Sequence, residues 1–317
     1  MSIGDGIRRN IAQVEPSERA SLRDAFIELN RRFYPGTRTD GVPGDVSFWF
    51  KQDEIHQSTH VHGGPEFVPW HRIIVNGIES LIRDINPALS LHYWDWTQDP
   101  RGIPSSNMGS GMAGNLNLFT PDFMGYGGPT SAPIGEPWLS AKYYDPTAAL
   151  HRDATGNPAD PPKIVRRFVV GAPLTVDVDN DIVNAPNYPV FRYLLEQAHN
   201  MMHGFVSMGG SHISFRDPFV FLLHSNVDRL FSRWQTDPMH PERLDPATIY
   251  GTESGEAELN GNVEPWSTGH SFDPFGDEHF TRPWCAPENL GEPFSYKHAN
   301  VVSPPAYDTN LTAPLVG

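Results

Sequence analysis

Histidine is the residue type whose spacing points most clearly to chemistry in this chain. The chain contains 14 histidines, and in the stretch LLEQAHNMMH two of them, His199 and His203, lie four residues apart. An α-helix places such a pair on one face. His224 lies in the next apolar segment of the chain. Two imidazoles from one helix and a third from its neighbour would form a three-histidine metal site.

A second group of histidines lies in the first half, in the stretch IHQSTHVHGGPEFVPWHR. His56, His62 and His71 would come from a helix, a loop and a following helix, and so offer a second three-histidine site. Imidazoles without carboxylate or thiolate favour copper or zinc over calcium, magnesium or an iron–sulfur cluster. The HExxH motif of zinc proteases is absent. Three ligands per metal leave positions open for a reactant.

The elements that must position these residues are expected to be helices. Apolar residues recur at helical spacing in the segments 17–33, 69–83, 190–203 and 218–234. A further helix is expected over 46–59, where Trp49, Asp53, His56 and His60 fall at steps of four, three and four. Ser17 is expected to cap the first helix, and Asp217 with Pro218 to start the last. The Pro-rich stretches 97–188 and 237–317 predict loops, with short strands only near 163–170.

These patterns predict a mainly α fold. A single domain over residues 1–317 is expected. Its helices at about 46–60, 69–83, 190–205 and 218–234 would form a four-helix bundle around the histidines, surrounded by long loops and few short strands.

The composition excludes several classes of partner. The 317 residues include 23 Lys and Arg against 38 Asp and Glu, a net charge of −15. This field repels nucleic acid and anionic membranes, so neither is expected as a partner. The single cysteine, Cys285, cannot form an internal disulfide or a thiolate metal site. The start MSIGDGIRRN does not resemble a signal peptide. A cytoplasmic protein is therefore expected, with export alongside a partner left open.

Four motifs of the chain together resemble the type 3 copper proteins, especially the bacterial tyrosinases. They are HGGPEFVPWHR (62–72), HYWDW (92–96), HNMMH (199–203) and DPFVFLLHSNVDRLF (217–231). The resemblance covers roughly residues 46–96 and 190–235. It implies that the four-helix bundle encloses a dinuclear copper site.

The resemblance also implies roles for individual residues. The ligands of one copper ion would be His56, His62 and His71, and those of the other His199, His203 and His224. Glu196, three residues before His199, matches the family's water-holding glutamate, and Asn200 would help it to hold that water. Two features stay open: His60 could replace His56 as a ligand, and either Ile213 or Phe215 could overhang the second copper.

The function implied is that of a dinuclear copper oxidase, a tyrosinase or polyphenol oxidase of the kind that starts melanin formation. Such an enzyme uses O2 to ortho-hydroxylate monophenols and to oxidise o-diphenols to o-quinones. Its partners would be phenolic small molecules and O2, with a copper-delivery partner protein and the oligomeric state left open. The alternatives are a catechol oxidase or o-aminophenol oxidase without efficient monophenolase activity, a haemocyanin-type oxygen carrier, and a zinc site.

Two pairings of charged residues are expected near the histidines. Asp228 lies one helical turn after His224, where it would orient Arg8, Arg9 or a ligand imidazole. Arg72 and Glu79, seven residues apart on one predicted helix, are expected to pair with each other.

Overall fold

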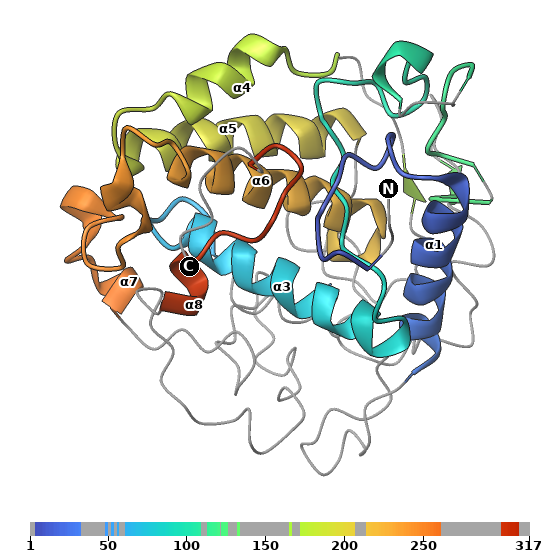
Figure 1. Ribbon diagram of the computed structural model, residues 1–317, viewed down its shortest axis with the longest axis horizontal. Coiled ribbons are helices and arrows are strands. Elements are labelled where there is room, and N and C mark those ends of the chain that lie inside the picture. Colours follow the sequence, from blue (N-terminus) through green and yellow to red (C-terminus); the bar gives the residue numbers. More distant parts are fainter. Residues whose placement is uncertain are drawn as a thin grey trace, which may run out of the picture.

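Three long helices form the centre of the protein (Figure 1): α3 (Phe67–Ile85), α5 (Tyr188–Val206) and α6 (Phe219–Gln235). The computed structural model describes residues 4–32, 48–49, 52–53, 56, 61–108, 113–120, 122–125, 132–133, 165–166, 172–206, 214–260 and 299–310. Helix α6 packs against both α3 and α5. Helix α4 (Val176–Val183) lies against α5 and α6, and α1 (Pro16–Arg31) packs against α3. The predicted mainly α fold is confirmed.

Helix α3 owes its position to one apolar stripe. Ile74, Ile78 and Ile82 follow one another at steps of four and are all fully buried. The helix begins two residues before the predicted start at Pro69 and extends to Ile85. Asn86 ends it by donating its backbone N–H to the carbonyl of Ile82 at 2.9 Å, and Pro87 follows.

Helix α6 is the central helix, because 16 of its 17 residues are buried. Burial on all sides is typical of a helix enclosed by its neighbours, and here the buried residues include several polar ones, such as Asp228 and Arg229. The predicted start is one residue early, because Pro218 occupies the N-cap position and the helix begins at Phe219. The carboxylate of Asp217 still accepts a hydrogen bond from the backbone N–H of Phe219 at 2.9 Å. The predicted cap of α1 is wrong, since the helix begins at Pro16 and Ser17 lies inside its first turn.

The predicted helix 46–59 is described only in part. Its described residues, 48–49, 52–53 and 56, are all helical, and the others lie outside the described residues. Trp49 is fully buried and donates its indole N–H to the carbonyl of Phe215 at 2.9 Å. This bond ties the segment that carries His56 to the residues just before α6.

One helix within the predicted loop region was missed. Helix α4 is only eight residues long, with Ile182 in the core and Val178 and Val183 packed against it, so its apolar pattern is short. Its position also depends on Asp179, whose carboxylate accepts hydrogen bonds from the indole of Trp96 at 2.6 Å and the guanidinium of Arg229 at 2.9 Å. These partners are distant in sequence, so local spacing could not reveal them.

The remaining elements are short. Strands β1 (Ala132–Pro133) and β2 (Val165–Arg166) pair antiparallel, and β2 lies where a short strand was predicted. Beyond α6, a predicted loop region contains short helices: η4 (Pro241–Leu244), η5 (Gly251–Glu253), α7 (Ala257–Asn260) and α8 (Ala299–Val302). Two further 3-10 turns, η1 (Ser105–Asn107) and η3 (Ser214–Arg216), lie elsewhere.

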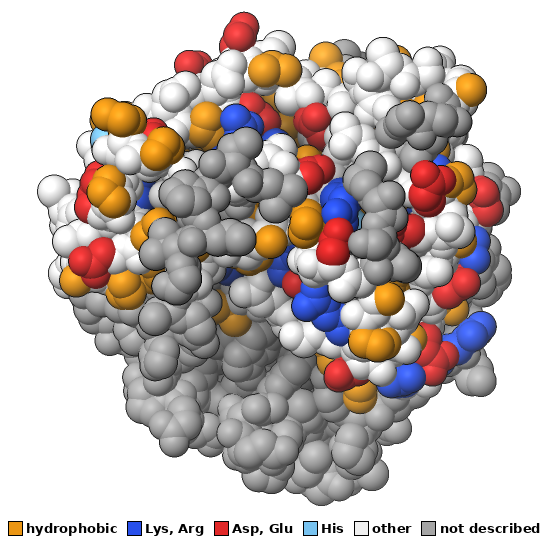
Figure 2. All heavy atoms as spheres, in the orientation of Figure 1, with side chains coloured by type: hydrophobic (Ala, Val, Ile, Leu, Met, Phe, Trp, Pro, Cys, Tyr) orange, Lys and Arg blue, Asp and Glu red, His pale blue; other side chains and the backbone are white. Residues whose placement is uncertain are grey.

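The surface of the described residues carries mixed charge. On the face in Figure 2, acidic and basic side chains are interspersed and no extended basic patch is visible among them. Within the described part of the chain, every helix is too short or too polar to cross a lipid bilayer.

Candidate metal centre

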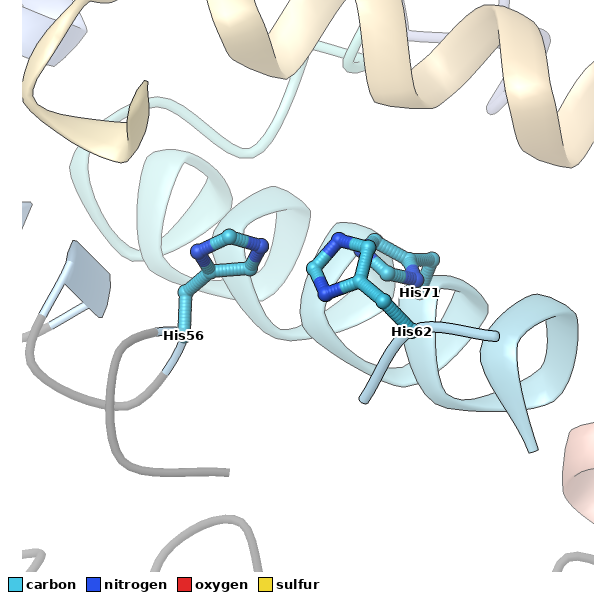
Figure 3. A group of neighbouring side chains, drawn as sticks. All are labelled: His56, His62 and His71. Carbon is cyan, nitrogen blue, oxygen red and sulfur yellow. The ribbon is translucent and has the colours of Figure 1, made fainter. Parts of the chain in front are cut away.

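The first group of histidines gathers in front of α3. One ligand atom from each of His56, His62 and His71 lies within 4.8 Å of the others. Figure 3 shows the ring of His62, from the loop before α3, beside that of His71 on the helix, with His56 facing them from a separate segment. His60, the alternative to His56, lies outside the described residues.

The second group joins α5 to α6. The Nε2 atom of His199 lies 3.0 Å from that of His224 and 2.8 Å from that of His203. His71 also belongs here, because a ligand atom of His71 lies within 4.8 Å of those of His199 and His224. The rings of His71 and His224 stack with centroids 4.8 Å apart, so the two groups are contiguous.

Three imidazoles are oriented by hydrogen bonds at Nδ1. His71 donates to the carbonyl of Phe67 at 2.7 Å and His224 to that of Val220 at 2.9 Å, in each case four residues earlier on the same helix. His199 Nδ1 lies 3.0 Å from the side-chain oxygen of Asn200. A proton on Nδ1 leaves the lone pair of Nε2 free for a metal, as in known metal sites.

Five of these six rings, those of His56, His71, His199, His203 and His224, are neutral at pH 7. Burial and the neighbouring histidines lower the pKa of His56, His71, His199 and His224 well below the ordinary value. For His203 the same two causes lower the pKa to about 3. With a proton on Nδ1, His199 and His224 both present an Nε2 lone pair, and at 3.0 Å these two atoms repel each other unless a cation lies between them.

Several of the buried ring nitrogens lack hydrogen-bond partners among the described residues. They are both nitrogens of His56, Nε2 of His71 and Nδ1 of His203. Buried polar atoms without partners are rare in proteins, because each one raises the free energy of the folded state by about 1–3 kcal/mol. A soft or borderline cation bound by imidazole would satisfy them, so the donor set fits copper.

Aromatic side chains form the wall behind the histidines. The ring of Phe215 lies 4.4 Å from that of His56 and 4.7 Å from that of His224, and Phe215 is fully buried. Phe67 lies 4.5 Å from His71. Of the two residues considered for the overhanging position, Phe215 therefore belongs to the packed wall, and Ile213 lies outside the described residues.

Glu196 and Asn200 lie on the α5 side of the centre. Glu196 is 6% exposed, and its Oε1 accepts a hydrogen bond from the backbone N–H of Gly63 at 2.7 Å. Burial raises the pKa of this carboxyl group. The hydrogen bond from Gly63 and the charge of Arg192 lower the pKa by less, so the net shift is upward. Asn200 is exposed and contacts the ring of His199. Both residues thus lie next to histidines of the two groups.

A buried ionic network lies behind the metal centre. Asp228 accepts hydrogen bonds from Arg8 at 2.8 Å, Arg72 at 2.5 Å and the hydroxyl of Tyr307 at 2.9 Å. Of the three partners predicted for Asp228, Arg8 is the one observed. The predicted pairing of Arg72 with Glu79 is wrong, because Glu79 pairs with Arg8 at 2.6 Å while Arg72 turns toward α6.

This network fixes α3 and α6 relative to each other. Arg72 follows His71 directly on α3, and Asp228 lies one turn after His224 on α6. Arg9, the second predicted partner of Asp228, instead pairs with Asp5. The ionic bond between the two helices therefore holds the stacked rings of His71 and His224 in register.

Comparison with known proteins places this helical, histidine-rich protein in a family. The family model described as the common central domain of tyrosinase matches residues 45–237, which include all six histidines of the two groups. The chain therefore belongs to the tyrosinase family and is a type 3 copper protein.

Individual relatives include enzymes and oxygen carriers. The chain is 27% identical to the tyrosinase of Streptomyces antibioticus over 82% of its own length and 93% of that protein. It is 26% identical to Hemocyanin 2 of Megathura crenulata over 72% of its length but only 6% of that much longer protein. A polyphenol oxidase from Thermothelomyces thermophila shares the fold, with a TM-score of 0.55 at 18% identity over 75% of this chain and 74% of that one.

Proposed function

We propose that the protein is a dinuclear copper oxidase that ortho-hydroxylates monophenols and oxidises o-diphenols to o-quinones with O2. The observation that carries the proposal is the convergence of six histidines from α3, α5, α6 and two further segments, several with buried nitrogens that have no partner among the described residues. The proposed ligand sets are His56, His62 and His71 for one copper, and His199, His203 and His224 for the other.

The residues around the centre support this chemistry. Copper held by imidazoles supplies one-electron redox exchange with O2 and with a phenol. The Nδ1 bonds of His71 and His224 keep the Nε2 lone pairs directed inward. Phe67 and Phe215 exclude water from the inner side. The exposed residues Gly63 and Asn200 mark the side from which a substrate would reach the histidines.

Glu196 and Asn200 are the proposed proton-handling residues. A phenol has a pKa of about 10, so its proton must be removed near the metal before hydroxylation. We propose that Glu196 and Asn200 hold a water that accepts this proton. The raised pKa of the buried Glu196 carboxyl group makes it a better proton acceptor than an exposed glutamate.

Two other functions share the same histidines. A catechol oxidase or o-aminophenol oxidase would oxidise diphenols or aminophenols without hydroxylating monophenols efficiently. A haemocyanin-type carrier would bind O2 reversibly without turnover, and the similarity to Hemocyanin 2 favours this candidate over a zinc site.

Metal analysis combined with turnover tests the proposal. The purified protein should contain two coppers per chain, and the reduced protein should gain an absorption band on admission of O2. Tyramine, L-tyrosine and 4-methylcatechol should all be converted to coloured quinones. One zinc per chain and no such band would contradict the proposal. A reversible absorption band without turnover would identify an oxygen carrier. Turnover of 4-methylcatechol without turnover of tyramine or L-tyrosine would identify a catechol oxidase.

A further inference from the structure

Helix α5 turns three polar side chains toward the loop that carries His62. Tyr188, Arg192 and Glu196 follow one another at steps of four, so they share one face of the helix. The hydroxyl of Tyr188 donates to the carbonyl of Pro65 at 2.5 Å. The other two side chains contact Gly63, the residue after His62.

Both peptide groups of Gly63 are held by this face of α5. Its N–H donates to Oε1 of Glu196 at 2.7 Å, and its carbonyl accepts from Nη1 of Arg192 at 3.4 Å. Gly63 has a φ of +80°, a conformation that other residues rarely adopt. Two hydrogen bonds thus fix a backbone conformation that the loop would otherwise leave readily.

Arg192 is itself anchored. Its guanidinium makes a bidentate ion pair with Glu253 of η5, with N–O distances of 2.5–2.9 Å. The two side chains are only 18% and 14% exposed, so solvent screens the pair less than a surface ion pair. Bidentate geometry also fixes the direction of the guanidinium. Glu253 therefore decides where Arg192 points.

The contrast with the other ligands explains why His62 needs this support. His71 and His224 lie within long helices, and each is oriented by the carbonyl four residues before it. His62 lies outside any helix, five residues before α3 begins. Its backbone position depends on the loop 61–66, which Tyr188, Arg192 and Glu196 of α5 contact at Pro65 and Gly63.

We propose that Tyr188, Arg192 and Glu253 are positioning residues for His62. They would set the affinity of the copper bound by His56, His62 and His71, and leave the copper on α5 and α6 largely unaffected. The inference rests on the proposed ligand sets. Removal of residues that orient metal ligands typically lowers metal affinity by about 10–100-fold.

The test combines a copper-independent and a copper-dependent measurement. In the metal-free protein, Arg192→Met removes the donor to the Gly63 carbonyl, so the bond from the Gly63 amide to Glu196 should open more often. The hydrogen-exchange rate of that amide should therefore rise at least about tenfold. In a chelator competition, the same variant should lose one of its two coppers about tenfold more readily. Arg192→Lys, which keeps a donor, should recover part of both effects.

Matched variants separate positioning from general destabilisation. Arg32→Met removes an exposed ion pair with Glu28 on α1 and should change neither measurement. Tyr188→Phe removes only the hydroxyl that reaches Pro65 and should weaken one copper, whereas Tyr193→Phe, at a 60% exposed position of the same helix, should not.

The outcomes distinguish this inference from the proposed function. If the wild type does not bind two coppers, the proposed function fails, while amide exchange still shows whether the loop is held. If the wild type binds two and Arg192→Met keeps both with wild-type affinity, the positioning role is wrong. Equal weakening of both coppers with a lower melting temperature would also overturn it, because it would indicate a purely structural ion pair.

Discussion

Asp228→Asn should destabilise the protein far more than an isosteric change usually does. Asp228 neutralises two buried guanidinium groups, those of Arg8 and Arg72, and accepts a third hydrogen bond from Tyr307. All of these side chains are almost completely buried. In asparagine, one oxygen becomes an amide group that donates, so a donor would face either Arg72 or the Arg8 and Tyr307 pair.

The expected loss of stability follows from the partners that each arginine would keep in the Asp228→Asn variant. Arg8 keeps its ion pair with Glu79 at 2.6 Å. The partners that Arg72 keeps are neutral: Gln235 at 2.7 Å, Ser232 at 3.0 Å and the carbonyls of Val301 and Val302. Breaking a buried ion pair on one side typically destabilises a protein by about 3–5 kcal/mol. We expect Asp228→Asn to lower the free energy of unfolding by this amount, which is a large share of the roughly 5–15 kcal/mol that stabilises most domains.

Denaturant unfolding of the metal-free protein measures this loss without a contribution from bound copper. Asp24→Asn is the matched control, because Asp24 pairs with Arg23 at 2.7 Å but is 63% exposed. The control should lose less than about 1 kcal/mol. If the free energy of unfolding falls equally in the two variants, the buried network of Asp228 stabilises the fold no more than a surface ion pair does.

Three further predictions concern the metal centre. At equal copper content, Glu196→Gln should lower the turnover of tyramine on the order of 10²-fold, because a monophenol must first lose a proton. The turnover of 4-methylcatechol should fall much less, and equal losses on both substrates would contradict the proton-accepting role. His56→Ala should remove one copper and abolish oxidation, whereas His60→Ala should keep both coppers; the reverse result would make His60 the ligand. Removal of copper by a chelator should lower the melting temperature, since a ligand at 100 times its Kd stabilises the folded state by about 2.7 kcal/mol. An unchanged melting curve would argue against copper bound in the core.

The sequence predicted the helices whose periodicity is local. The i, i+4 spacing of His199 and His203 placed both on one face of α5, and their Nε2 atoms lie 2.8 Å apart. The apolar stripe of α3 was also readable, and so was the start of α6 to within one residue, since each depends on residues within one or two turns. The expected helix, loop and helix also grouped His56 with His62 and His71, whereas their assignment as the ligands of one copper ion rested on the family resemblance.

Contacts between distant segments could not be predicted in this way. Arg72 could reach several carboxylates, and only the packing of α3 against α6 decides that Asp228 is its partner. Helix α4 is held partly by the buried carboxylate of Asp179, whose partners Trp96 and Arg229 are distant in sequence. Tyr188 and Arg192 lie four residues apart in the sequence, so they share one face of α5. No pattern in the neighbouring sequence indicated that this face contacts the loop of His62.

The bond between Arg8 and Tyr307 has a consequence for how the protein is made. The two residues are separated by 299 positions, yet both contact Asp228 directly behind the metal centre. A ribosome synthesises the chain from the N-terminus, so Arg8 and Asp228 lack the Tyr307 hydroxyl until residue 307 has emerged. We therefore expect a nascent chain that already contains all six histidines to complete the packing behind His71 and His224 only after about 80 further residues have been synthesised. Stable copper loading would then wait for that later segment.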